Sequence, residues 1–298
     1  APSLACSIRG TISICLKRKS IALASYILMY LGLMKRERSI RIQLRLFALF
    51  AGILLGSNFG GCQKKSDTED SAVLVFAAAS LSDALSEVGE AFREETGMDV
   101  AFNFAGSQTL AQQIAASNRG DVFVSADENW MDFVAGENRL MEGNRVSLLS
   151  NRMVLVSSTN SRFQVDRVDD LCGLDFAFLC IGDPDSVPAG RYARKWFEQA
   201  TCSNSEAVWE QLRSRISPAP NVRAAMEQVL GRSDSIGVIY RTDFMKAESR
   251  AKLLLESPLR DIRYPAALLK NREHIAGGKA FYEFLLSETS MVIFERHG

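Results

Sequence analysis

A serine lies where an apolar strand pattern at residues 73–76 turns, through three alanines, into a helix pattern. Ser80 follows the alanines, and apolar side chains then recur at helical spacing, at Leu81, Leu85, Val88 and Phe92. The first N–H groups of a helix have no partner within the helix and lie at the positive end of its dipole, which suits an anion. Ser80 could also be only the N-cap of its own helix.

Similar corners, at which a strand or a loop leads into a helix, recur along the chain. Ser107 follows a strand pattern and a small-residue loop, Ala189 follows Val187-Pro188 at a helix start, and Val222 follows Asn221, a good N-cap residue. Tyr240 ends the strand pattern of residues 235–240. Each has an ordinary alternative: turn chemistry for the serine, and packing for the tyrosine. If these corners face one place, their hydroxyl and N–H groups would hold an anion without a charged side chain.

Composition and charge narrow the class of protein. The 298 residues are 47% hydrophobic and 23% charged, as in a globular protein. Residues 1–62 carry nine Lys or Arg and one acid, whereas residues 63–298 carry 26 basic and 34 acidic residues, a net charge of about −8. An acidic body argues against a nucleic-acid partner.

The N-terminal segment has the pattern of an export signal. Basic residues follow Met34, an apolar run covers residues 46–55, and small residues lead to Cys62. Cys62 after Gly-Gly is similar to the lipidated cysteine of bacterial lipoproteins, and residues 63–71 are typical of a flexible tether. We therefore expect residues 1–62 to direct export to the periplasm, with a lipid anchor at Cys62 or simple cleavage. Residues 1–33 could precede the true start.

The body, from residue 72, alternates strand and helix patterns, which predicts an α/β fold with mostly parallel sheets. Crossovers expected at residues 146–157 and 264–269 divide it into two lobes, with residues 72–151 and 266–298 in lobe 1 and residues 152–265 in lobe 2. Ligands in open α/β sheets bind outside the carboxyl ends of the strands. The corners described above are therefore expected to face the cleft between the lobes.

Other polar and sulfur-containing residues have ordinary interpretations. Three body cysteines could form one disulfide and leave one buried thiol, or all remain free; they are Cys172, Cys180 and Cys202. We expect Asp183 to fix its loop and Arg223 to form a surface ion pair. The three tryptophans fall on helix patterns and are expected in the core, at Trp130, Trp196 and Trp209.

A hydrolase is the main rival class of function. A serine hydrolase needs a histidine base, and the only two histidines, His274 and His297, come late in the chain in no recognisable catalytic context. The G-x-S-x-G motif is missing around Ser107, and no cluster of metal-ligand residues is apparent. We therefore expect no enzymatic activity, no cofactor and no direct protein–metal ligands.

The ordered set of motifs resembles the molybdate-binding proteins of bacterial ABC-type importers. The resemblance covers nearly all of residues 72–298 and is carried by residues 75–81, 104–111, 121–132, 182–190, 221–223 and 237–240. It implies the two-lobed periplasmic-binding-protein fold, with the ligand in the interlobe cleft. Two departures stand beside Ser107, where Gly106 and Gln108 replace serines that are common in that family.

The resemblance also implies the ligand and its contacts. A molybdate or tungstate oxyanion would be held by hydroxyl and backbone donors of Ser80, Ser107, Ala189, Val222 and Tyr240. The protein would act as a monomer and deliver the anion to an ABC permease in the inner membrane. The alternative is another oxyanion, such as sulfate.

Overall fold

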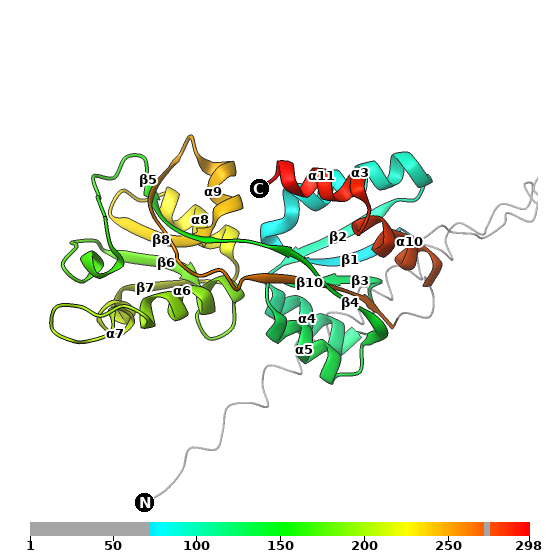
Figure 1. The fold of residues 1–298 in the computed structure, drawn as a ribbon, viewed down its shortest axis with the longest axis horizontal. Helices are drawn as coiled ribbons and strands as arrows, with labels where there is room; N and C mark the ends of the chain where they lie inside the picture. The colour runs from blue at the N-terminus through cyan, green and yellow to red at the C-terminus, as the bar shows by residue number, and fades with distance from the viewer. Residues whose placement is uncertain (1–71, 118, 271–274) are drawn as a thin grey trace, which may run out of the picture. The chain divides into compact units, whose positions relative to one another are not determined.

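The computed structural model describes residues 72–117, 119–270 and 275–298, all within one compact unit. Two five-stranded sheets with flanking helices form the two lobes of this unit (Figure 1). The predicted export segment, Cys62 and the tether lie outside the described residues. Within the described part of the chain, no helix combines the length and apolar character needed to cross a membrane.

The first sheet has the strand order β2-β1-β3-β10-β4. β1 pairs in parallel with β2 and β3, whereas β10 runs antiparallel to its neighbours β3 and β4. Helices α3, α10 and α11 lie on one face, and α4 and α5 on the other (Figure 1). The elements are β1 (Val73–Ala78), α3 (Ser82–Thr96), β2 (Val100–Ala105), α4 (Ser107–Ser117), β3 (Val122–Val124), α5 (Glu128–Gly136), β4 (Leu140–Ser150), β10 (Arg263–Leu269), α10 (Ile275–Leu285) and α11 (Glu288–Arg296).

The second sheet repeats this plan with the order β7-β6-β8-β5-β9. β6 is parallel to β7 and β8, and β5 is antiparallel to β8 and β9. α8 and α9 lie on one face and α6 and α7 on the other (Figure 1). The elements are β5 (Met153–Ser158), β6 (Phe178–Gly182), α6 (Pro188–Glu198), α7 (Val208–Leu212), β7 (Ile216–Ala219), α8 (Val222–Leu230), β8 (Ser235–Tyr240), α9 (Arg241–Ala247) and β9 (Ala251–Glu256).

In each sheet four strands share one direction and the fifth opposes them, so both sheets are mixed, with two parallel and two antiparallel pairings each. The expected two-lobed α/β fold is confirmed. The chain passes from the first sheet to the second between Ser150 and Met153, and returns between Glu256 and Arg263. Two connecting segments are the geometry of a hinge, because rotation about them moves one lobe against the other without breaking either sheet.

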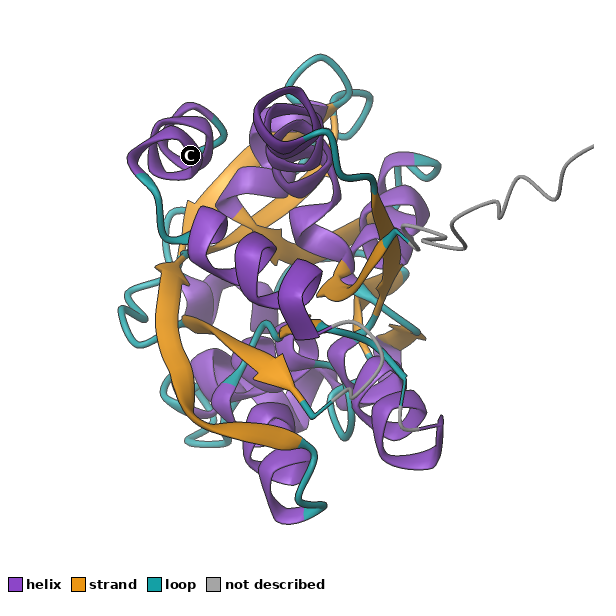
Figure 2. Cartoon of the chain, turned by 90° about the vertical axis from the view of Figure 1, so that its right-hand side faces the viewer, coloured by secondary structure: helices purple, strands orange, loops and turns teal. Residues whose placement is uncertain are grey.

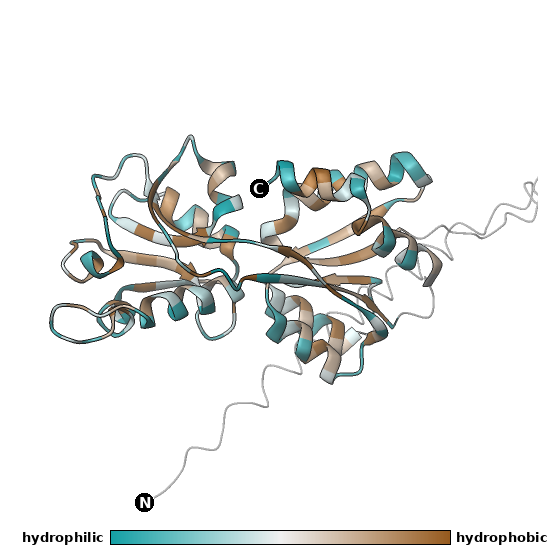
Figure 3. Cartoon of the chain, viewed as in Figure 1, coloured by the Kyte–Doolittle hydropathy of each residue, from teal (hydrophilic) through white to brown (hydrophobic). Residues whose placement is uncertain are grey.

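The local sequence explains the ends of these elements. Gly97 ends α3 in the left-handed conformation, with φ of 75°, and its N–H donates to the Arg93 carbonyl. Asn221 caps α8, and its side chain accepts the Ala224 N–H at 2.9 Å. The strands are largely hydrophobic and the outer helix surfaces are hydrophilic (Figure 3), and helices lie on both sides of the strands (Figure 2). Burial between these layers therefore forms the core.

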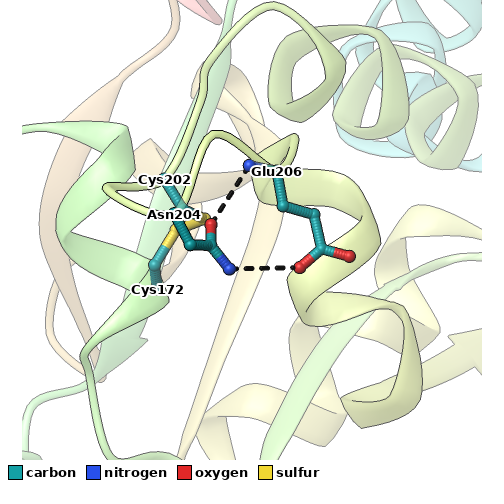
Figure 4. Close-up of a disulfide and its surroundings, with 4 residues drawn as sticks. All are labelled: Cys172, Cys202, Asn204 and Glu206. Carbon is teal, nitrogen blue, oxygen red and sulfur yellow. Dashed lines mark hydrogen bonds between the residues drawn. A yellow bond between two sulfur atoms is a disulfide. The ribbon is translucent and has the colours of Figure 1, made fainter.

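The structure also decides between the cysteine alternatives. Cys172 and Cys202 form a disulfide (Figure 4). Cys180 is a buried free thiol. The loop after Cys202 is ordered by Asn204, whose side-chain oxygen accepts the Glu206 N–H at 3.1 Å. The disulfide joins two segments of the second lobe that are 30 residues apart. It is therefore compatible with an oxidising compartment outside the cytoplasm.

Candidate functional site

A small pocket lies where the carboxyl ends of the strands from both sheets meet. It has about 220 Å³ of empty space, part of it open to solvent, which suits a small inorganic ion better than a drug-sized molecule. All five residues predicted to contact the ligand line it. The complete lining is Ala78, Ala79, Ser80, Ala105, Gly106, Ser107, Ala126, Val187, Pro188, Ala189, Asn221, Val222 and Tyr240.

Lobe 1 contributes the corners after its three parallel strands. Ser107 is the first residue of α4, directly after β2 and Gly106. Ser80 lies in a 3₁₀ turn of residues 79–81 between β1 and α3, and α3 begins at Ser82 with no side-chain cap. The interpretation of Ser80 as an N-cap is therefore wrong: one extra turn of chain separates it from the helix and leaves its hydroxyl available for other contacts.

Lobe 2 contributes two helix N-termini. Ala189 is the second residue of α6, after Pro188, and Val222 is the first residue of α8. N–H groups in the first turn have no carbonyl four residues earlier within their helix. Gly190 makes the approach of α6 to β6 possible, because a Cβ there would lie 2.7 Å from the Asp183 carbonyl oxygen. The backbone N–H groups of Ala189 and Val222 are thus placed at the pocket as donors.

The hydroxyl of Ser107 is oriented by its neighbour. The Ala126 N–H, just beyond β3, donates to Ser107 Oγ at 3.0 Å. Because that bond occupies a lone pair of the oxygen, the Ser107 O–H remains free to donate. Ser107 is 1% exposed, so a small ion in the pocket would be the partner of that hydrogen.

A chain of hydrogen bonds also ends at the Ser80 hydroxyl. Arg152 N–H donates to Asn151 Oδ1 at 2.8 Å, which orients the amide and leaves Nδ2 as the donor toward Tyr264, 3.5 Å from its hydroxyl. The Tyr264 hydroxyl lies 3.1 Å from Ser80 Oγ, in a hydrogen bond of which either oxygen can be the donor. When Tyr264 donates, the Ser80 O–H is left to donate into the pocket. Sequence analysis missed Asn151 and Tyr264, because they are 71 and 184 residues from Ser80 and have no local motif.

The third hydroxyl belongs to Tyr240 at the end of β8. The side chain is 1% exposed, and its hydroxyl interacts with that of Tyr264. Its ring packs edge-on against Tyr264, with 5.6 Å between centroids. Burial raises the pKa of Tyr240 well above its usual value, so the phenol stays protonated and can donate.

The pocket is uncharged, since no Lys, Arg, Asp, Glu or His is among the lining residues that the structure describes. Over the described ranges, no group of three or more His, Cys, Asp or Glu is arranged to hold a metal ion. With three hydroxyls and several N–H groups as donors, the pocket can complement all the oxygen atoms of a small, fully deprotonated oxyanion.

Comparison with known proteins agrees with this chemistry. The family model for bacterial extracellular solute-binding proteins matches residues 73–298. The chain belongs to this family. It is 32% identical over 257 residues to the molybdate-binding protein ModA of Escherichia coli, an alignment that covers 84% of this chain and 96% of that protein. The expected resemblance to molybdate-binding proteins is thereby confirmed.

Solved structures confirm the two-lobed fold of this solute-binding protein. The substrate-binding domain assigned to a molybdenum ABC transporter from Clostridium difficile is 27% identical, with a TM-score of 0.57; the match covers 76% of this chain and 97% of that domain. The periplasmic molybdate-binding protein of Azotobacter vinelandii has a TM-score of 0.65 at 20% identity, with the same two coverages. At that identity, the second match is evidence for the fold alone.

The solute-binding protein has a buried ion pair next to the pocket. Arg223, the second residue of α8, places Nε 2.6 Å from Asp243 Oδ1 and Nη2 2.6 Å from Asp83 Oδ2 of the other lobe. Asp243 is fully buried, and this burial raises the pKa of its carboxyl to about 7. The expected surface ion pair is the one with Asp83, whose side chain is 43% exposed, and Arg223 pairs in addition with the buried Asp243 of α9. Asp183 fixes its loop as expected, by accepting the Asp185 N–H at 2.9 Å.

A second group of contacts joins the lobes of the solute-binding protein at the rim formed by α5 and α6. Trp130 Nε1 donates to the Ser186 carbonyl at 2.8 Å, and Arg191 lies over its ring, 5.0 Å from the centroid. Arg191 also forms an ion pair with Asp127 at 3.1 Å. Trp130 is half-buried, so the expectation of a core position is wrong for it, because its indole N–H is used across the lobe boundary. Trp196 and Trp209 are buried as expected.

The hydrolase alternative finds no support in this geometry. His274 lies outside the described residues. His297 is at the end of α11, where its Nε2 lies 2.7 Å from Glu87 Oε2, and it does not line the pocket. The partners of the Ser80 and Ser107 hydroxyls are Tyr264 and the Ala126 N–H, neither of which is a general base at neutral pH.

Proposed function

We propose that this solute-binding protein binds molybdate, and tungstate of nearly the same size, and delivers it to the permease of an ABC importer. The ligand contacts are the hydroxyl groups of Ser80, Ser107 and Tyr240 and the backbone N–H groups of Ala189 and Val222. The observation that carries the proposal is the pocket itself, which presents oriented donors and has no charged side chain among its described lining.

The chemistry of the pocket selects for charge and protonation state. A buried dianion without a cationic partner is stable only when its oxygen atoms all accept hydrogen bonds. An anion that retains a proton, such as hydrogen phosphate, brings an O–H donor to a site in which the hydroxyls already donate. The O–H of the anion would then face a donor of the protein, and neither group would have an acceptor. Fully deprotonated tetrahedral anions are therefore favoured. Among them, sulfate is smaller and would fit the same cage more loosely.

Capture depends on short-range contacts. The residues from 63 onward carry a net charge of about −8, which does not attract anions at a distance. Binding energy then comes from the converging donors and from closure of the two lobes around the ion. The links between the sheets at residues 151–152 and 257–262 are the places at which the lobes would rotate.

The location that we propose is the outer face of the cytoplasmic membrane. Residues 34–62 would direct export, and Cys62 would carry the lipid that anchors a monomeric protein through the tether of residues 63–71. Mass spectrometry of the membrane fraction tests this point, because a Cys62→Ser variant would lose the lipid mass and appear as a soluble protein. An unchanged mass and location in that variant would refute the anchor.

Calorimetry of residues 72–298 with molybdate, tungstate, sulfate and phosphate tests the proposed ligand. We expect tight binding of the first two, weaker binding of sulfate and none of phosphate at neutral pH. Tight binding of sulfate without molybdate binding would overturn the proposal. Hydrolysis of an ester that is lost in the Ser80→Ala variant would favour the rival enzyme instead.

A further inference from the structure

A glutamine of lobe 1 forms a hydrogen bond with the backbone of lobe 2 beside the pocket. Gln108 is the second residue of α4, and its Nε2 donates to the Pro220 carbonyl at 2.8 Å. A glutamine in the first turn of a helix is usually solvated, but this one is only 8% exposed. The bond therefore exists in an environment that the meeting of the two lobes creates.

The glycine before it makes room for this bond. A Cβ at Gly106 would lie 2.5 Å from Gln108 Nε2 and 2.6 Å from the Pro220 carbonyl oxygen. Gly106 is not among the glycines with positive φ, so its backbone does not require glycine. The constraint comes from the neighbouring amide and from the facing lobe. The hydrogen bond of Gln108 therefore depends on the absence of a side chain at Gly106.

The position of the bond links it to the ligand. Ser107 lies between Gly106 and Gln108 in the chain, and Val222 is two residues after Pro220. Both are proposed contacts of the oxyanion. A bond between Gln108 and Pro220 therefore sets the spacing between a donor of lobe 1 and a donor of lobe 2.

We infer that Gln108 is an interlobe latch, which stabilises the closed arrangement around the bound oxyanion and slows its release. Because Gly106 has no side chain, it leaves room for the Gln108 amide. This inference rests on the proposed function. When the lobes separate, the amide and the Pro220 carbonyl return to water, so the bond favours only the closed state. By population shift, such a contact acts on the rate of release and leaves the initial encounter unchanged.

The latch is of limited strength. Gln108 Oε1 is buried and makes no hydrogen bond within the described residues, so closure removes that atom from water without compensation. A net contribution typical of one neutral hydrogen bond corresponds to about a three- to tenfold change in an equilibrium constant. A latch of this size slows escape of the ligand and can still be opened by a transport partner.

Substitution of the amide gives the decisive experiment. We expect Gln108→Met to release molybdate about three- to tenfold faster than the wild type, with an unchanged association rate. Exchange of radiolabelled molybdate against an excess of unlabelled molybdate measures release. Gln112→Met is the matched control, since Gln112 is an exposed glutamine on the same helix. Equal unfolding midpoints of the ligand-free variants establish that the fold is intact.

A charged variant gives a second readout that a packing role would not produce. In Gln108→Glu a carboxylate faces the Pro220 carbonyl, which repels it at pH 8, so release becomes faster than in Gln108→Met. Protonation restores a donor, and burial raises the pKa of such a carboxyl, so the release rate falls toward the wild-type value as the pH is lowered to about 5.5. Gly106→Ala should also accelerate release, because its Cβ meets Pro220 only in the closed state.

The outcomes separate the two claims. If the wild type binds none of molybdate, tungstate and sulfate, the proposed function fails and the latch fails with it. If the wild type binds molybdate, but Gln108→Met and Gly106→Ala release it at the wild-type rate, only the latch is wrong. A release rate of Gln108→Glu that does not change with pH also refutes the hydrogen bond to Pro220.

Discussion

The hydroxyl of Tyr240 provides the sharpest test of the donor cage, by which we mean the hydroxyl and N–H groups proposed to hold the oxyanion. Tyr240 is buried, and its hydroxyl interacts with that of Tyr264, so the Tyr240→Phe variant removes at most one neutral hydrogen bond from the ligand-free fold. In the complex it would donate to an anionic oxygen. A hydrogen bond to a charged group contributes about 1.5–3 kcal/mol, so the variant should bind molybdate about 10- to 150-fold more weakly.

The same variant should leave the stability of the ligand-free protein nearly unchanged. Loss of one neutral hydrogen bond costs about 0.5–1.5 kcal/mol, and phenylalanine avoids the desolvation of the buried hydroxyl, which offsets that loss. The free energy of unfolding of the ligand-free variant should therefore lie close to that of the wild type. The combination of weaker binding and undiminished stability separates a ligand contact from a packing residue.

Calorimetry at neutral pH measures the affinity, and urea unfolding without ligand measures the stability. Tyr282→Phe is the matched control, because Tyr282 is a buried tyrosine of α10 that does not line the pocket. The reasoning is refuted if Tyr240→Phe binds molybdate within twofold of the wild type, or if it loses more than about 1 kcal/mol of ligand-free stability.

Further predictions concern the residues around the cage. Tyr264→Phe removes the hydroxyl that orients Ser80, so the ratio of molybdate to hydrogen phosphate affinity in competition calorimetry should fall; an unchanged ratio contradicts the hydrogen-bond chain. Trp130→Phe removes an interlobe bond, so affinity should fall by about two- to tenfold and the change in fluorescence on binding should shrink. For Asp243, the folded pKa of about 7 exceeds the unfolded value of 3.8, so the folded protein keeps a proton that the unfolded chain has lost. The free energy of unfolding of the wild type should therefore fall as the pH rises from about 4 to 7, and urea unfolding of Asp243→Asn should show a flatter dependence on pH.

Local patterns in the sequence were sufficient for the architecture. Strands that alternate with helices predict the α/β class, because each element must bury one apolar face. Gly97 and Asn221 mark their helix ends by backbone conformation and by side-chain capping, which are properties of neighbouring residues. The five predicted contact residues follow from corners between elements and from the family resemblance, and the structure brings all five to one pocket.

The tertiary structure decided what depends on distant partners. Ser80 resembles a helix cap in the sequence, but its hydroxyl is oriented by Tyr264, which is 184 residues away. Trp130 lies in a helix pattern typical of the core, and its indole N–H bonds across the lobes to Ser186. Such contacts have no local signal, because they form only when two lobes of separate sequence meet.

The corner at Ser80 shows what local sequence determines and what only the contacts of the folded chain determine. Strand, small residues and helix are determined by hydrophobic period and backbone preference within a dozen residues, so the sequence alone predicts an anion-binding corner. Whether its hydroxyl donates or accepts depends on which groups surround it in space. Only the folded chain supplies Tyr264, which forms a hydrogen bond with the Ser80 hydroxyl, and Asn151, which donates to Tyr264.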